Sequence, residues 1–160
     1  MTTTDPTRDL LRHTLATLAY RGGKAIRGVP PSFADFRAGE STRTPLQILA
    51  HIGDLFDWAC DLARGEKKWN EATPQSWEHE VQRFFDGLQR FDRQLADEPV
   101  KCDPGRLFQG PIADAFTHIG QIAILRRMAG VPVRGENYFI ADIAAGRVGA
   151  EQAPPKREFD

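Results

Sequence analysis

Two side chains that can bind metal ions are spaced one helical turn apart within an apolar stretch of the sequence. Asp114 and His118 lie in residues 111–129, where apolar residues recur at helical spacing, and residues four positions apart share one helix face. A second such stretch, residues 46–63, carries His51. Because ionisable groups are rarely buried without a partner, we expect the three side chains to point toward one core, where a divalent cation would satisfy all of them.

The four histidines divide into two groups by the helix face that each occupies. His51 continues the apolar face of its stretch, and His118 shares a face with Asp114, so both are predicted to point inward. His79 lies among charged residues at three- and four-residue spacing, and His13 lies off a stripe of leucines. These two are predicted to be structural or surface residues.

Spacing alone favours a purely structural interpretation of the three residues. Asp114 and His118 would then be a hydrogen-bonded pair, and His51 a core histidine held by a neighbouring polar group. The convergence of all three on one core favours a metal site, because helical bundles build such sites from inward ligands on facing helices. Gln121, one turn beyond His118, is predicted either to orient a ligand or to pack between helices.

Two imidazoles and one carboxylate define an open type of metal site. Three protein ligands leave coordination positions for water or substrate, as in catalytic rather than closed structural zinc centres. The same ligands hold iron in non-haem Fe(II) oxygenases, and nickel also accepts them. The ligand set therefore predicts a divalent metal without selecting it.

Four helical segments must position these ligands. Proline follows a capping residue at three places, which is typical of a helix start. The three pairs are Asp5–Pro6, Thr44–Pro45 and Thr73–Pro74. The Gly22–Gly23 pair is predicted to end the first helix and Gly65 the second, with an irregular connection up to Thr44 that contains one short helical turn at residues 32–37.

The fourth helix is predicted over residues 111–129, mostly buried, after a loop with Pro104 and Gly105. A short helical pattern follows at residues 138–145, and residues 145–160 form a Gly/Pro/charged extension that packs on the domain or contacts a partner. No run alternates with period two. The chain is therefore predicted to be all-α, a single four-helix-bundle domain over residues 1–160 with its longest connection between helices one and two.

Composition excludes several classes of function. Lys and Arg total 21 against 22 Asp and Glu, and without a basic stripe we expect no nucleic-acid partner. No charge-free apolar run reaches about 18 residues, so no membrane span is expected. Cys60 and Cys102 form no C-x-x-C pair, and the first residues carry no apolar signal segment, which predicts a cytoplasmic protein.

The remaining reactive residue types are predicted to be structural. Cys60 is expected to be a small buried hydrophobe, and Cys102, in a loop without a neighbouring base, is a poor nucleophile. Trp58 and Trp69 are expected to pack around the second helix. Three arginines are expected to stay solvated and to offset a helix dipole rather than bind a substrate carboxylate. These are Arg126, Arg127 and Arg134.

The ligand-bearing segments resemble a known family. The run Asp114-Ala-Phe-Thr-His118-Ile-Gly-Gln121-Ile, followed by Leu125-Arg-Arg, resembles the fourth helix of the DinB-like (damage-inducible) metalloprotein superfamily. The run His51-Ile-Gly-Asp-Leu is similar to the second helix of that superfamily. The likeness covers nearly the whole chain in order and length, and residues 134–149 resemble the tail of one bacterial subfamily.

This resemblance implies a four-helix bundle, frequently dimeric, that holds a divalent metal, often nickel or zinc. The family ligands are one histidine of helix two and an H-x-x-x-H pair of helix four. His51 and His118 match the first and last of them, whereas Asp114 replaces the middle histidine. That replacement keeps a plausible ligand but changes its charge and hardness.

The resemblance also implies candidate activities. Relatives include transferases and isomerases that use the low-molecular-weight thiols mycothiol or bacillithiol, so we expect a homodimeric, thiol-dependent transferase acting on small electrophiles. A hydrolase that uses metal-activated water is one alternative. A non-enzymatic metal-binding or stress-related interaction domain is the other, because the sequence offers no obvious general base beside the ligands.

Overall fold

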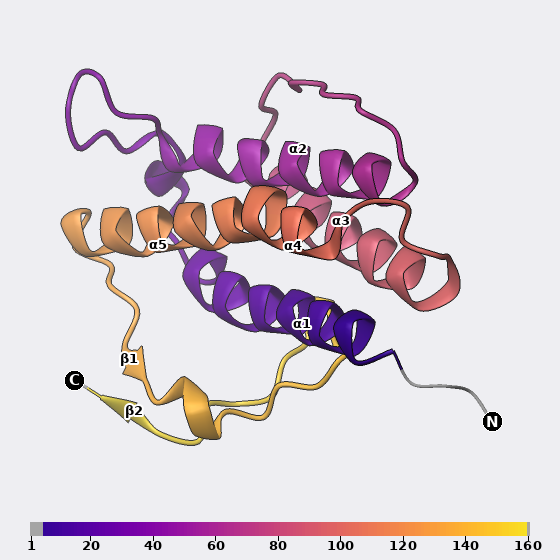
Figure 1. Ribbon diagram of the computed structural model, residues 1–160. Coiled ribbons are helices and arrows are strands. Elements are labelled where there is room, and N and C mark those ends of the chain that lie inside the picture. Colours follow the sequence, from indigo (N-terminus) through magenta and orange to yellow (C-terminus); the bar gives the residue numbers. More distant parts are fainter. Residues whose placement is uncertain (1–4, 160) are drawn as a thin grey trace.

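The computed structural model describes residues 5–159 and is mostly helical, which confirms the predicted all-α class (Figure 1). Residues 1–4 and 160 lie outside the described residues. The predicted domain of residues 1–160 and the prediction about a signal segment both include some of them. The four long helices are α1 (Pro6–Ile26), α2 (Pro45–Ala63), α3 (Trp77–Asp97) and α5 (Ala113–Met128). In the described part of the chain, no helix is long and apolar enough to cross a membrane.

The shorter elements lie between and after the long helices. They are a 3-10 helix at Pro31–Asp35, α4 (Pro104–Leu107), a π-helical turn at Phe108–Ile112, β1 (Gly135–Glu136), a 3-10 helix at Tyr138–Ile140 and β2 (Glu158–Phe159). The two strands pair antiparallel.

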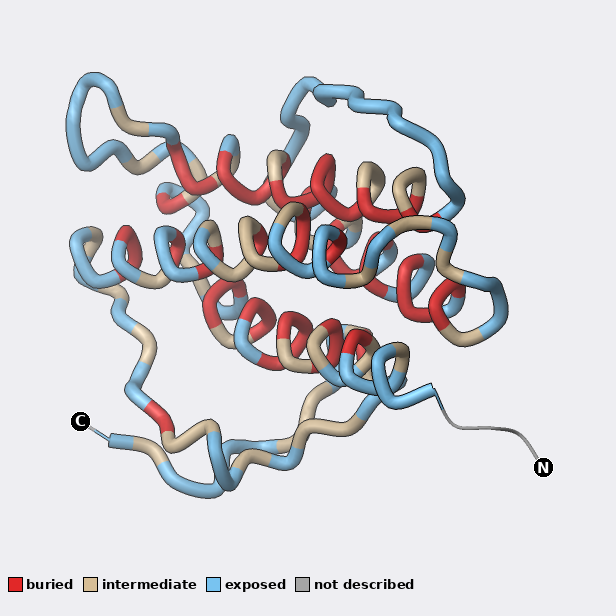
Figure 2. The backbone as a smooth tube through the Cα atoms, viewed as in Figure 1, coloured by how far each residue is buried: buried red, intermediate tan, exposed pale blue. Residues whose placement is uncertain are grey.

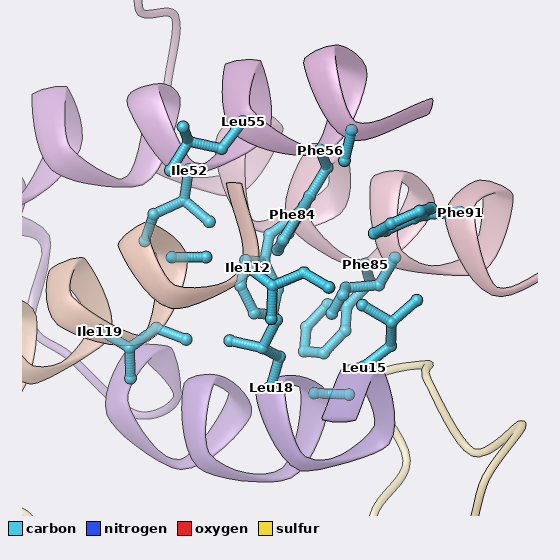
Figure 3. Close-up of a cluster of buried hydrophobic side chains, with 14 of the residues drawn as sticks. Leu15, Leu18, Ile52, Leu55, Phe56, Phe84, Phe85, Phe91, Ile112 and Ile119 are labelled. Atoms are coloured by element: carbon cyan, nitrogen blue, oxygen red, sulfur yellow. The ribbon is translucent and has the colours of Figure 1, made fainter. Parts of the chain in front are cut away.

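The long helices share one hydrophobic core. Both α1 and α2 pack against α3 and α5, and their buried faces meet in the middle of the molecule (Figure 2). Aliphatic and aromatic side chains from all four helices interdigitate there (Figure 3). Full burial of each large apolar side chain contributes about 1.5–3 kcal/mol, so this core fixes how α2 and α5 lie beside each other. Its fully buried members include Leu15, Leu18, Ile52, Phe56, Phe84, Phe91 and Ile112.

The prediction that Gly22–Gly23 ends the first helix is wrong, because α1 continues to Ile26. Both glycines are buried, and a Cβ built at Gly22 would lie 2.4 Å from Phe84 Cζ and 2.9 Å from Ile119 Cδ1. Gly22 therefore allows α3 and α5 to approach α1 closely, rather than breaking the helix.

We expect Gly22→Ala to destabilise the fold. Overpacking a core costs about 1–3 kcal/mol, which exceeds the gain of up to about 1 kcal/mol from replacing a helical glycine by alanine. The matched control is Gly120→Ala on α5, where a Cβ meets nothing within 4 Å, so it should leave stability unchanged or raise it. Urea unfolding of both variants measures the difference, and equal midpoints would contradict the close packing at Gly22.

The second helix matches its prediction, since α2 spans Pro45–Ala63 and Gly65 follows it with φ +86°. The third helix was predicted to start at Thr73–Pro74, and this is wrong. Its N-cap is Ser76, whose side chain accepts a hydrogen bond from the His79 amide. The segment before Ser76 is instead held against α2, because the Ala72 amide donates a hydrogen bond to the buried Asp54 carboxylate at 3.3 Å.

The fourth helix begins earlier than predicted. The expected loop around Pro104 is helical, capped by Asp103, and continues through a π-helical turn that accommodates Pro111, which has no N–H to donate. The prediction that residues 111–129 are mostly buried is also wrong, because α5 keeps a solvent-exposed face. That face includes Thr117, Gly120, Gln121, Ile124, Arg127 and Met128.

Arg126 is buried, which contradicts the prediction that it is solvated. Its guanidinium donates to the carbonyls of Ala25 (3.0 Å), Arg27 (2.6 Å) and Val131 (2.9 Å). The first two acceptors lie at the carboxyl end of α1, where helix carbonyls lack partners. Arg126 therefore ties the end of α1 to α5, while Arg127 is exposed as predicted.

The carboxyl-terminal segment packs back along α1 (Figure 1). The helical pattern predicted over residues 138–145 forms only the short 3-10 helix. The Glu136 side chain is buried, accepts a hydrogen bond from the Tyr20 hydroxyl and pairs with Lys24 at 2.8 Å. Lys24 also contacts Glu158 at 2.9 Å, so the segment is held by charged contacts to α1.

Candidate metal centre

The candidate site lies where α2 and α5 run side by side. The first turn of α2 is fixed by a capping box, in which the Thr44 hydroxyl accepts from the Gln47 amide and the Gln47 side chain accepts from the Thr44 amide. His51 lies about one turn beyond Gln47. Asp114 and His118 project from the first turns of α5 toward it, so two helices bring the three predicted ligands together.

The three side chains are close enough to share one ion. Oδ2 of Asp114 lies 3.5 Å from Nε2 of His51 and 3.5 Å from Nε2 of His118. The two imidazole rings are nearly perpendicular, with centroids 4.7 Å apart. One donor atom from each residue lies within 4.8 Å of the others, so the carboxylate bridges two imidazoles whose Nε2 atoms approach the same point.

These separations fit a divalent metal. With bonds of about 2.0–2.1 Å and tetrahedral angles, two ligand atoms on one zinc ion lie about 3.3–3.4 Å apart. Both carboxylate-to-imidazole distances are 3.5 Å. The donor set, two nitrogens and one oxygen, is also one that zinc, nickel and iron accept. The residues present therefore fit an ion with three protein ligands and open positions.

The site lies at the edge of the core rather than inside it, which corrects the prediction that all three ligands point into the core. The side chains of His51 and His118 are 19% and 12% exposed, but that of Asp114 is 47% exposed. The innermost face of α5 is occupied by apolar residues one position away from the ligands, such as Ala115 and Ile119. Solvent or a substrate can therefore reach the site from the Asp114 side.

Gln121 orients His118. Its Oε1 lies 2.8 Å from His118 Nδ1, and an amide oxygen only accepts, so Nδ1 carries the proton and donates it. The Nε2 lone pair is then free on the side that faces Asp114. Of the two roles predicted for Gln121, this contact favours the orienting one, a common arrangement around metal-binding histidines.

The surroundings of His51 favour its neutral form. Partial burial lowers the pKa of His51 below its ordinary value of 6.5. Repulsion between the protonated imidazoles of His51 and His118 and the charge of Arg43 lower it further, although Asp114 opposes this. An imidazole must be neutral to coordinate a metal. His51 is therefore available as a ligand throughout the neutral pH range.

In metal-free protein we expect the pKa of His51, followed by NMR of its ring proton, to lie below 6.5. The His51 side chain then binds a proton more readily in the unfolded chain than in the native state. Its contribution to the free energy of unfolding is therefore complete above pH 6.5 and is lost as the pH falls below that value. The same residue titrated in urea is the control. A native midpoint equal to or above the value in urea would contradict the description of His51.

Trp69 forms a wall of the site that the sequence did not identify as such. It lies on the loop of residues 64–76, and its ring meets His51 edge-on with centroids 5.8 Å apart and Trp58 at 5.7 Å. Both tryptophans pack along α2 as predicted. The link to His51 was not visible in the sequence, because the loop has no regular spacing.

The protein's own thiols are poorly suited to nucleophilic chemistry. Cys60 is buried as predicted, and burial raises its pKa to about 11. Burial, together with the Asp103 charge, also raises the pKa of Cys102. Neither cysteine belongs to the three-residue group.

Within residues 5–159, His51, Asp114 and His118 form the one group of three such side chains close enough to share an ion. His13 and His79 are exposed, as predicted, and take no part in it. Searches of models of known protein families, of curated proteins and of solved structures found no match to this chain.

Proposed function

We propose that the protein is a DinB-like four-helix-bundle metalloprotein in which His51, Asp114 and His118 bind a divalent metal and leave positions open for a reactant. The observation that carries this proposal is the meeting of three donor groups from two helices, with both carboxylate-to-imidazole distances at 3.5 Å. The proposed ion is nickel or zinc, with Fe(II) as a further candidate, because all three accept this ligand set.

We propose that the activity is transfer of a low-molecular-weight thiol to a small electrophile. A bound divalent ion would lower the pKa of a thiol that coordinates it. The sulfur would then form a bond to the electrophilic carbon, the leaving group would depart with the electron pair of its bond, and the thiol proton would pass to solvent. Two observations support this proposal. The exposed side of Asp114 gives reactants access to the site. The raised pKa values of Cys60 and Cys102 make the chain's own thiols poor nucleophiles, so the reactive thiol would come from outside the chain.

The residues of this chain would divide the work of such a reaction. Gln121 fixes the tautomer of His118. Trp69 covers one side of His51, while the exposed side of Asp114 and the cavity beside His118 stay open to reactants. Because the carboxylate supplies a negative charge that a third imidazole would not, it would reduce the net charge of the loaded site.

The test begins with elemental analysis of untagged protein purified without chelators. We expect about one divalent ion per chain in the parent and a much lower content in His51→Ala. The loaded protein is then assayed for conjugation of 1-chloro-2,4-dinitrobenzene with glutathione, bacillithiol and mycothiol. Absence of a stoichiometric ion would overturn the metal site, whereas an ion without conjugation by any thiol would overturn the transferase activity alone.

The homodimer implied by the family resemblance stays a prediction. Sedimentation velocity of the untagged protein, with and without Zn²⁺, measures it directly. A mass of two chains is expected, and a single-chain mass at micromolar concentration would contradict it.

A further inference from the structure

A cavity opens directly beside the candidate metal centre. It has a volume of about 530 Å³ and lies between the start of α2, the second half of α5 and the connection that precedes α2. This volume falls within the range of about 300–1,000 Å³ that is typical of small-molecule sites. Its lining residues include His118 and Gln121 but neither His51 nor Asp114, so a molecule in the cavity borders the candidate metal centre at His118.

The walls of the cavity are mainly apolar. Ile48 and Leu125 form its buried part, and Ile124 and Met128 lie at its rim. The side chains of Ile124 and Met128 are apolar but 51% and 55% exposed. Contact between this apolar surface and water is unfavourable. A ligand with an apolar body would remove this surface from water.

Arg43 provides the only cationic side chain among the residues that line the cavity. Within residues 5–159 its guanidinium makes no hydrogen bond or ion pair, in contrast to Arg83 and Arg126, which are fully engaged. It also borders a smaller polar cavity of about 190 Å³ that includes His51, and its charge acts on His51. An unpaired arginine at this place offers two parallel donors to an anionic group.

We propose that this cavity binds a small organic carboxylate with an apolar body. The carboxylate pairs with Arg43, and the body lies on Ile48, Ile124 and Met128. This inference rests on the proposed function, since it assigns the class of molecule that the metal centre acts upon. Recognition requires both parts of the ligand, because the apolar wall supplies contact area and the arginine supplies the charge.

The test compares octanoate with octanol by calorimetry, using full-length protein both with and without one equivalent of Zn²⁺. Octanoate is expected to bind more tightly than octanol, with NMR shift changes at the methyl groups of Ile48, Ile124 and Met128. Arg43→Gln should weaken octanoate by at least about tenfold and leave octanol unchanged, because a charge-assisted hydrogen bond is lost. Arg127→Gln removes an exposed arginine that does not line the cavity and is the matched control.

Three results would overturn the inference: equal affinities for octanoate and octanol, equal effects of the two arginine variants, or shift changes away from the cavity. Zinc uptake by the same samples is measured separately. If zinc binds but octanoate does not, the carboxylate site fails and the metal site stands. If octanoate binds at Arg43 without any zinc uptake, the pocket stands and the proposed function fails.

Discussion

Replacing His118 by alanine is expected to raise the dissociation constant for Zn²⁺ by more than about 100-fold. Loss of an outer partner of a metal ligand alone typically costs about 10–100-fold, and His118 would contribute a direct ligand atom. His51→Ala should have an effect of the same size, because its Nε2 is equally distant from the Asp114 carboxylate. Competition with a chromophoric chelator measures each constant, and circular dichroism verifies that the helices are intact.

Two further variants make this result specific. Gln121→Leu should weaken binding by about tenfold, since it removes only the acceptor that orients His118. His79→Ala, at an exposed position on α3, should leave affinity unchanged. If His79→Ala and His118→Ala lowered affinity equally, zinc would be binding to surface histidines and not to the proposed centre.

Replacing Arg83 by methionine is expected to destabilise the protein by about 3–5 kcal/mol, the cost of leaving a buried charge without its partner. Arg83 donates to Asp54 at 2.6 Å, to Asp57 at 2.8 Å and to the Ala50 carbonyl at 3.0 Å. The Asp54 side chain is only 3% exposed, so water cannot replace the lost contacts. This cluster joins α2 to α3 one turn beyond His51 and so helps to hold α2, which carries His51, in place.

Urea unfolding measures the effect, and Arg90→Met is the control. Arg90 also pairs with Asp57, but its side chain is 54% exposed, so its loss should cost less than about 1 kcal/mol. The double variant Arg83→Met with Asp54→Leu should recover part of the loss, because it removes the isolated buried charge. Equal stabilities of Arg83→Met and Arg90→Met would contradict a structural role for the buried pair.

The helices that carry the site were predictable because their local signals are strong. Thr44–Pro45 begins α2 as the cap-plus-proline pattern requires, and Gly65 follows its end. The Gly22–Gly23 pair was misinterpreted because a glycine that breaks a helix and one that lets two helices touch have the same local pattern. The positions of Phe84 and Ile119 distinguish them, and those positions depend on tertiary packing.

The candidate site was predictable in its members but not in its surroundings. Helical spacing places Asp114 and His118 together, because a four-residue step keeps two side chains on one face, and it places His51 on the apolar face of its own helix. The burial of these side chains was not predictable, because spacing shows which residues share a helix face but not whether that face points to the centre or to the edge of the core. Arg43 and Trp69 come from irregular connections, where no periodicity relates sequence position to place in space.

The most direct test of the metal centre is anomalous X-ray diffraction at the zinc edge from crystals grown with one equivalent of Zn²⁺. A single strong peak is expected about 2.0–2.2 Å from Nε2 of His51, Nε2 of His118 and a carboxylate oxygen of Asp114. A zinc peak held by other residues, or full occupancy in solution with no peak between these three side chains, would contradict the proposed centre.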